Sequence, residues 1–370
     1  MDSEMQVFNA ANAWLNHKRI ERNKHAKYLL QRVRFSLLTI PALNNILDNN
    51  LWITENVECT DVINKAIRNK KPPHSETVKS INRYCSQENF NILLVGGTNC
   101  ENKTSRNAFT IDAYNLSLKN NLSPFKHKRK YLKVVCVKGE MYVFNAHVHG
   151  NISVMDIEKY SPVTNAWDVI GQMYDRRRYY CACSFIDSFY VLGGVLNNCT
   201  NSCLVFNTTN KIWREVAGMY GGRDNASCAV FEGRIVITGG YNAIDGTLNT
   251  VEAYDHIDDS WEKMPSMNVR RCCHNSVVIK NKLFVVGDLS SQTNEVFDSC
   301  SKKFALLQHP SINLRPHLTA DVTSIGNKLI MFSNYYGSVF IYDVENEVWS
   351  EKSCEATKHI KYFSCASLPQ

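Results

Sequence analysis

The sequence predicts an all-β fold, a six-bladed β-propeller with a short α-helical segment at its N-terminus. The main observation is a pattern that recurs six times at intervals of 46 to 49 residues. Repeats of this length, built from short strands, are typical of propeller blades. Two further observations support the prediction: the aromatic residues of the repeats, and a C-terminal strand that supplies what the first repeat lacks.

Each repeat contains a short apolar strand, and in the clearest copies two glycines end that strand. These pairs are Gly96-Gly97, Gly193-Gly194 and Gly239-Gly240. Glycine lets the backbone turn sharply and lets a neighbouring segment approach closely. The corresponding segments at 142–146, 285–288 and 331–334 lack the pair. We therefore expect the second, fifth and sixth blades to be less regular.

Five repeats contain an aromatic residue followed seven positions later by another. The pairs are Tyr160/Trp167, Phe206/Trp213, Tyr254/Trp261, Phe297/Phe304 and Tyr342/Trp349. In the first repeat Tyr114 takes the first position, and Asn121 or Leu122 stands where tryptophan is expected. Large aromatic side chains can fill the space between adjacent twisted sheets. We therefore expect the four tryptophans of these pairs to be mostly buried between blades.

The glycine pair, the aromatic residue and the tryptophan seven positions later resemble the signature of the kelch repeat. The resemblance covers about residues 90–370. It implies a kelch β-propeller that binds other proteins through the loops of its blades.

The ring is expected to close through the C-terminus. Later blades begin with a strand that precedes the glycine strand, as at 180–185 and 226–231, but no such strand precedes the segment at 91–95. A strand of the right kind follows the last tryptophan, at 362–368. We expect these two segments to pair, which completes six blades and removes exposed sheet edges.

Residues 1–70 have the apolar spacing of helices. Val7, Phe8, Ala11, Trp14 and Leu15 fall on one helical face, and further apolar groups follow to Ile67. Residues 71–89 are polar, contain two adjacent prolines and are typical of a linker. The propeller then occupies residues 90–370.

The first segment resembles the later part of the BACK domain, the helical module between the BTB and kelch domains of kelch-like proteins. The resemblance is carried by Val7-Phe8, Ala13-Trp14-Leu15, Glu21-Arg22, Leu29-Leu30 and residues 33–38. The early BACK helices and the BTB domain have no counterpart. We therefore expect a shortened kelch-like protein, or a fragment of a longer BTB-containing chain.

Charge and hydropathy argue against two classes of partner. The formal net charge is +7, but no block of five like charges occurs. The cluster at 126–130 is more typical of a solvated loop than of a nucleic-acid site. No apolar run approaches the roughly 18 residues of a membrane span, and the N-terminus does not have the layout of a signal peptide. We expect a cytoplasmic protein with no nucleic-acid or membrane partner.

The sequence contains no recognisable catalytic constellation, so we expect neither an enzyme nor a cofactor. The ligand set of galactose oxidase and the repeated boxes of sialidases, both propeller enzymes, are not found. His147 and His149 could share a face of a strand, but two histidines without a third ligand make a poor metal site. The 14 cysteines show no paired CxxC motifs, and most are expected to be small buried thiols.

In five repeats a basic residue follows the second aromatic residue of the pair by ten or eleven positions, and the nearest match in the first repeat is Arg129. The candidates are Arg129, Arg177, Arg223, Arg271, Arg315 and His359. Repeats place equivalent residues on a ring, so these side chains are candidates for binding an acidic loop or peptide of a partner protein. The alternative is that they brace neighbouring loops. Arg176, Arg178 and Arg270 are additional arginines that the repeat does not explain.

The resemblance to kelch-like proteins implies that the propeller recruits a substrate to a cullin-3 ubiquitin ligase. In that family the BTB domain makes most of the cullin contact, so cullin binding is expected only if a longer form supplies that domain. The alternative is a cytoskeletal kelch protein that binds actin.

Overall fold

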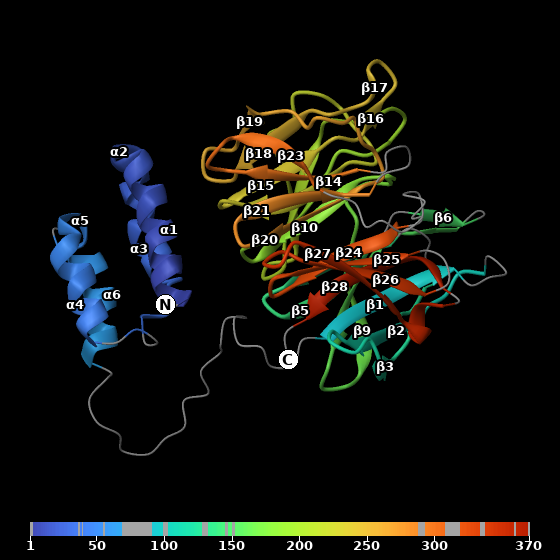
Figure 1. The fold of residues 1–370 in the computed structure, drawn as a ribbon, viewed down its shortest axis with the longest axis horizontal. Helices are drawn as coiled ribbons and strands as arrows, with labels where there is room; N and C mark the ends of the chain where they lie inside the picture. Colours follow the sequence, from blue (N-terminus) through green and yellow to red (C-terminus); the bar gives the residue numbers. More distant parts are fainter. Residues whose placement is uncertain are drawn as a thin grey trace. The chain divides into compact units, whose positions relative to one another are not determined.

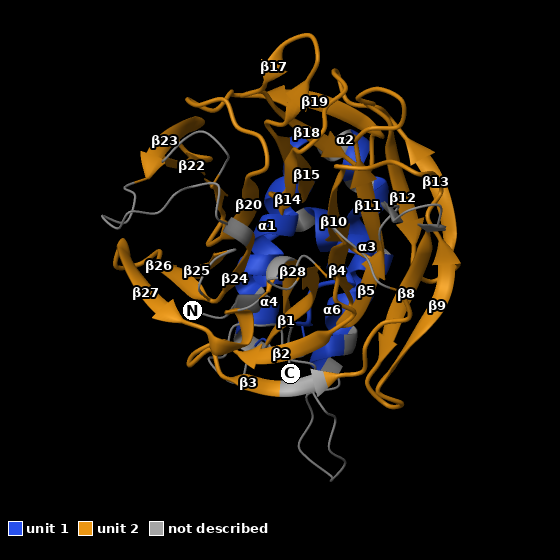
Figure 2. Cartoon of the chain, turned by 90° about the vertical axis from the view of Figure 1, so that its right-hand side faces the viewer, with its two compact units in different colours: residues 1–86 blue, residues 87–370 orange. Residues whose placement is uncertain are grey.

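The computed structural model describes two compact units, residues 1–86 and 87–370 (Figure 2). Within them, the described residues are 3–35, 38, 40–54, 56–68, 91–98, 103–127, 132–144, 147–149, 152–287, 293–307, 319–333, 337–358 and 360–368. The expected linker at 71–89 lies outside these residues.

The first unit is helical (Figure 1). Its elements are α1 (Ser3–His17), α2 (Arg19–Arg22), η1 (Asn23–His25), α3 (Ala26–Leu30), α4 (Ile40–Asn49), α5 (Leu51–Thr54) and α6 (Val57–Arg68). Phe8 and Leu15 of α1 pack with Leu30, Ile46 and Ile63 in one apolar core. None of the helices in the described parts of the chain is long and apolar enough to cross a membrane.

The second unit contains six four-stranded antiparallel sheets. Each blade is given from its innermost strand outward. The first blade consists of β28 (Lys361–Leu368), β1 (Asn91–Thr98), β2 (Ala108–Asp112) and β3 (Leu118–Leu122), and the second of β4 (Lys133–Val137), β5 (Glu140–Phe144), β8 (Asp156–Ser161) and β9 (Ala166–Gln172). The third blade consists of β10 (Cys181–Phe185), β11 (Ser188–Leu192), β12 (Cys203–Asn207) and β13 (Ile212–Val216). A short hairpin, β6 (His147–His149) and β7 (Ile152–Val154), extends the second blade.

The remaining blades repeat this order. The fourth blade consists of β14 (Ser227–Phe231), β15 (Arg234–Thr238), β18 (Val251–Asp255) and β19 (Ser260–Met264). The fifth consists of β20 (Asn275–Ile279), β21 (Lys282–Val286), β22 (Asn294–Asp298) and β23 (Lys303–Leu307), and the sixth of β24 (Thr319–Ile325), β25 (Lys328–Ser333), β26 (Ser338–Asp343) and β27 (Val348–Ser353). The fourth blade carries a second hairpin, β16 (Tyr241–Asn242) and β17 (Gly246–Thr247). The innermost strands of neighbouring blades contact one another in a closed ring, which confirms the six-bladed propeller (Figure 2).

The C-terminal strand closes the first blade as expected. In the β28–β1 pair Leu368 lies opposite Asn91 and Ser364 lies opposite Val95. Asp321 of β24 strengthens this junction, because its carboxylate accepts hydrogen bonds from the Cys365 amide at 2.9 Å and the Ser364 hydroxyl at 3.0 Å. The closing strand is therefore bonded to its own blade and to the sixth blade.

The six apolar cores of the propeller each lie between two adjacent blades. Trp167 and Trp261 are buried there, which confirms the expectation, whereas Trp213 and Trp349 are only partly buried. Three of these indole N–H groups donate to a carbonyl of the preceding blade or of the loop that follows it. The acceptors are Ser123 for Trp167, Gln172 for Trp213 and Ala217 for Trp261. The tryptophans therefore join blades by packing and by a hydrogen bond.

The first repeat differs from the expected alignment. Ile111 and Leu118, seven residues apart, lie opposite each other in the β2–β3 pair, as Tyr160 and Trp167 do in the second blade. Tyr114 lies in the turn between the strands and is exposed. The prediction for Tyr114 was wrong because this blade has no aromatic residue at either marked position.

Candidate binding face and its buried arginines

Two sets of loops lie at the same end of the propeller. The innermost strand of each antiparallel blade begins at this end, and the second strand ends there. We call this end the mouth face and define it by the described loops 173–180, 193–202, 217–226, 239–250 and 265–274. Arg177, Arg223 and Arg271 and the glycine pairs Gly193-Gly194 and Gly239-Gly240 belong to these loops.

Arg177 is anchored inside its own blade, with 1% of its surface exposed. Its Nη2 contacts Asp175 Oδ2 at 2.6 Å, and its Nε donates to Asp175 Oδ1 at 2.9 Å. Its Nη1 donates to the backbone carbonyls of Gly193 at 3.2 Å and Ser202 at 2.9 Å. The guanidinium therefore joins the inter-blade loop to the loop that follows the glycine pair.

Arg223 makes the equivalent contacts in the fourth blade and is 2% exposed. It forms an ion pair with the buried Glu252, and its Nη1 donates to the carbonyls of Gly239 at 3.1 Å and Thr250 at 3.3 Å. Burial lowers the pKa of Arg223, and the charge of Glu252 opposes that change. The ion pair thus offsets part of the cost of burying the guanidinium.

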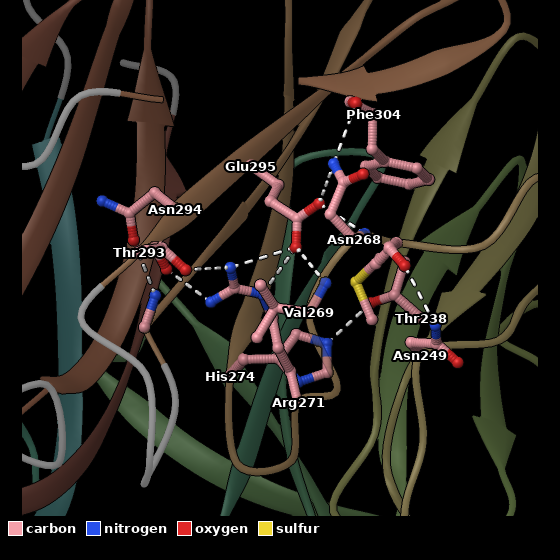
Figure 3. Close-up of polar contacts among 12 residues, drawn as sticks. Thr238, Asn249, Asn268, Val269, Arg271, His274, Thr293, Asn294, Glu295 and Phe304 are labelled. Carbon is pink, nitrogen blue, oxygen red and sulfur yellow. Dashed lines mark hydrogen bonds and ion pairs between the residues drawn. The ribbon is translucent and has the colours of Figure 1, made fainter. Parts of the chain in front are cut away.

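Arg271 and Glu295 form a fully buried ion pair in the fifth blade (Figure 3). Arg271 Nη2 and Nε donate to Glu295 Oε1 at 3.1 and 3.3 Å, and Nη1 donates to the Thr293 carbonyl. Glu295 also accepts hydrogen bonds from the backbone amides of Asn268 and Val269. One carboxylate therefore holds both ends of the loop segment 268–271.

The buried glutamates recur at one position, two residues before the first aromatic residue of the pair. All three, Glu158, Glu252 and Glu295, accept a hydrogen bond from a backbone amide of the preceding inter-blade loop. The donors and acceptors are Lys126 and Glu158 at 2.7 Å, Tyr220 and Glu252 at 2.9 Å, and Asn268 and Glu295 at 2.8 Å. In the third blade Leu204 takes this position, and Asp175 supplies the carboxylate for Arg177 from the loop itself. The spacing of glutamate and aromatic residue is a signal that our sequence analysis did not use.

These contacts match the bracing role at Arg177, Arg223 and Arg271. A guanidinium with at most 2% exposure cannot meet a partner unless its loop opens. Their burial favours the alternative that these three side chains brace neighbouring loops, and their geometry gives no support to a direct role in binding; the assignment to partner binding stays a prediction. The remaining candidates, Arg129, Arg315 and His359, lie outside the described residues.

The glycine pairs allow the backbone at the bracing arginines to pass very close. Gly194 N donates to the Arg223 carbonyl and Gly240 N donates to the Arg271 carbonyl, both at 2.8 Å. A Cβ atom at Gly193 would lie 2.5 Å from the Arg223 carbonyl oxygen, and Gly193 has φ +62°. Any other residue at this position would meet both strain and a backbone clash. The glycine pair therefore links consecutive blades.

Besides Asp245 and several asparagines, the exposed side chains of the mouth face include aromatic, aliphatic and basic ones. The large apolar ones are Tyr174, Tyr179, Leu196, Tyr220, Tyr241 and Ile244. Arg176 and Arg178 lie among them, exposed and without a polar side-chain contact to any described residue, while Arg270 donates to the carbonyls of Asp245 and Thr247. Tyrosine and arginine are enriched where proteins bind one another. The additional arginines, and not the buried ones, are thus the basic groups available on this face.

The β16–β17 hairpin projects from the fourth blade on this face (Figure 1). Ile244 at its tip is 93% exposed, and Tyr241 at its base is also exposed. Arg270 donates to the carbonyls of Asp245 and Thr247, and these hydrogen bonds fix the hairpin to the next inter-blade loop. The hairpin therefore presents an apolar tip from an anchored base.

Metal chemistry finds no support in the part of the chain that the structure describes. There, no group of three or more histidine, cysteine, aspartate or glutamate side chains could hold a metal ion. His147 and His149 belong to β6, but their side chains are outside the described set. Among the described residues twelve cysteines are free thiols, and half of them are buried, fewer than the expected majority: Cys59, Cys181, Cys203, Cys228, Cys354 and Cys365.

Comparisons with known proteins agree with this architecture. A model of the kelch motif matches residues 176–220 and 222–268, and a model described as "BTB And C-terminal Kelch" (BACK) matches residues 1–48. Kelch-like protein 38 of Danio rerio is 24% identical over an alignment that covers 99% of this chain and 65% of that protein. The chain therefore contains kelch motifs in its propeller and a BACK-like segment at its N-terminus, and it is similar to Kelch-like protein 38 along its length. It spans 65% of the length of this zebrafish relative.

Two shorter matches fall within the same class of repeat. Alpha-scruin of Limulus polyphemus is 26% identical over 37% of this chain and 16% of its own length. Kelch repeat and BTB domain-containing protein 1 of cowpox virus is 27% identical over 39% of this chain and 27% of its own length. The kelch and BACK resemblances inferred from the sequence are thus confirmed. The two kelch matches contain Arg177 and Arg223, and their order in the chain agrees with two successive blades.

Proposed function

We propose that this kelch propeller binds a partner protein on its mouth face and does not catalyse a reaction. The observation that carries the proposal is the exposed set of tyrosine, aliphatic and arginine side chains on loops that buried ion pairs hold in place. Such loops lose little entropy on binding, because the braces order them beforehand. Exposed Arg176 and Arg178 favour an acidic segment of the partner, since a guanidinium can bind a carboxylate through two hydrogen bonds.

In this proposal the propeller recognises substrates for a cullin-3 ubiquitin ligase in the cytoplasm. The similarity to Kelch-like protein 38 along 99% of the chain supports this role over other uses of a propeller. The contact with the cullin would require a BTB domain, supplied by a longer form. Actin binding is the second candidate, and the match to alpha-scruin is the comparison that bears on it.

We expect the double variant Tyr174→Ala/Ile244→Ala to lose capture of the proteins that the wild type retains from a cell lysate. The control is Val163→Ala/Val348→Ala, which removes exposed apolar side chains away from the mouth face. Capture would be compared by quantitative mass spectrometry, and sedimentation with actin filaments would be measured for the same variants. Equal capture by both variants would place the binding site elsewhere. Co-sedimentation of the wild type without capture of a cullin or of substrates would favour the second candidate.

A further inference from the structure

Two consecutive cysteines, Cys272 and Cys273, lie in the inter-blade loop 265–274. They sit between two anchors, because Arg271 before them is paired with Glu295 and His274 after them is buried. Cys273 is exposed and Cys272 is partly exposed. The Cys273 amide also donates to the Asn225 carbonyl at 2.8 Å, which fixes the loop to the preceding one. The dithiol is therefore accessible on a backbone that is held on both sides.

The backbone at the two cysteines departs from an extended strand. Consecutive side chains of an extended strand point to opposite faces. Cys273 instead has φ +55°, in the left-handed region, so this separation of the two side chains is not imposed. Hydrogen bonding with the Cys272 side chain, desolvation and the charges of Cys272 and Asp224 raise the pKa of Cys273. Cys273 therefore stays a thiol at neutral pH.

A disulfide is not the natural product of this pair. Consecutive Cα atoms are about 3.8 Å apart across a trans peptide, whereas disulfides usually join Cα atoms about 4.4 to 6.8 Å apart. A direct sulfur–sulfur bond would therefore be strained and easily reduced. A single soft atom that bonds to both sulfurs avoids this strain, because the sulfurs need only converge on it.

We propose that Cys272 and Cys273 form a bidentate site for trivalent arsenic compounds and for electrophiles of the same thiophilic class. With an arsenoxide, R–As=O, two S–H bonds break and two S–As bonds form. The oxygen leaves with both protons as water, and no atom changes oxidation state. The site does not depend on partner binding, so this proposal can be tested separately from the proposed function.

The test uses phenylarsine oxide on the folded protein, with peptide mapping by mass spectrometry. We expect one phenylarsenic group on the peptide that contains both cysteines. It should survive an excess of a monothiol and be removed by a dithiol such as 2,3-dimercaptopropanol. In Cys272→Ser and in Cys273→Ser the amount of bound phenylarsenic should fall at least tenfold. The control Cys300→Ser, which removes a separate exposed cysteine, should bind phenylarsenic as the wild type does.

Alkylation by N-ethylmaleimide gives a second readout that does not depend on arsenic. Because Cys273 resists ionisation, its alkylation at pH 7 should be slow and should accelerate at alkaline pH. Retention of the arsenical by either serine variant, or its absence from folded wild type, would overturn the proposal. Circular dichroism of each variant would show whether a loss of binding reflects a loss of fold.

Discussion

At the scale of single residues, the recurring arginine was visible in the sequence but its role was not. Spacing identifies Arg177, Arg223 and Arg271 as equivalent, yet it cannot say whether a long side chain turns inward or outward. Burial was decided by carboxylates that the sequence analysis had not connected to them, Asp175, Glu252 and Glu295. A buried charge without such a partner would be too costly to retain.

We expect Arg271→Ala to lower the free energy of unfolding by about 3 to 5 kcal/mol, because it leaves Glu295 buried and unpaired. Arg178→Ala, at an exposed arginine in the equivalent loop before the third blade, should change the free energy of unfolding by less than about 0.5 kcal/mol. Urea denaturation of both variants would measure the difference. Similar small losses at both positions would show that Arg271 is not a brace.

His274 predicts a loss of stability in acid. Desolvation, and to a lesser extent the charge of Arg271, lowers the pKa of this buried imidazole to about 3. The unfolded chain takes up the proton near pH 6.5 but the folded chain does not, so stability falls as the pH drops from about 6.5 toward 3. At pH 5 the loss from this residue is about 2 kcal/mol relative to pH 7.5. In His274→Gln this part of the pH dependence should vanish; an unchanged pH profile would contradict a buried neutral histidine.

At the scale of elements, the repeat predicted the strands well, because each blade must satisfy the same packing on both faces. The closing strand was found from a gap in the pattern, and its pairing with β1 was confirmed. Two features of the elements were not predicted from the sequence. Tyr114 was assigned to the wrong position because the first blade lacks both aromatic marks, and the β16–β17 hairpin is an insertion that no repeat encodes.

Removal of residues 361–370 should make the propeller insoluble, since it exposes the inner edge of β1 and the apolar core shared by the first and sixth blades. Removal of residues 369 and 370 alone is the matched control and should leave solubility unchanged. Size-exclusion chromatography and thermal unfolding of both truncations would decide. A soluble long truncation that unfolds cooperatively would show that the ring does not need this strand.

At the scale of the whole molecule, the regular and irregular parts have different tasks. Regular features, the glycine pairs and the bracing ion pairs, hold the blades together. Irregular ones, Arg176, Arg178 and the projecting hairpin, supply the exposed chemistry of the mouth face. The sequence could therefore predict the propeller, but the exposed side chains of the mouth face depend on side-chain direction in loops, which no period describes.

The most direct test of the mouth face is charge reversal. Arg176→Glu/Arg178→Glu changes two exposed arginines on it, and Lys302→Glu/Lys303→Glu makes the same change in net charge at the opposite end. Capture of partner proteins would be measured for both variants across a range of salt concentrations. We expect the arginine variant to fold but to lose capture, the lysine variant to keep capture, and wild-type capture to weaken as salt rises. Full capture by the arginine variant would show that the mouth face is not the binding site.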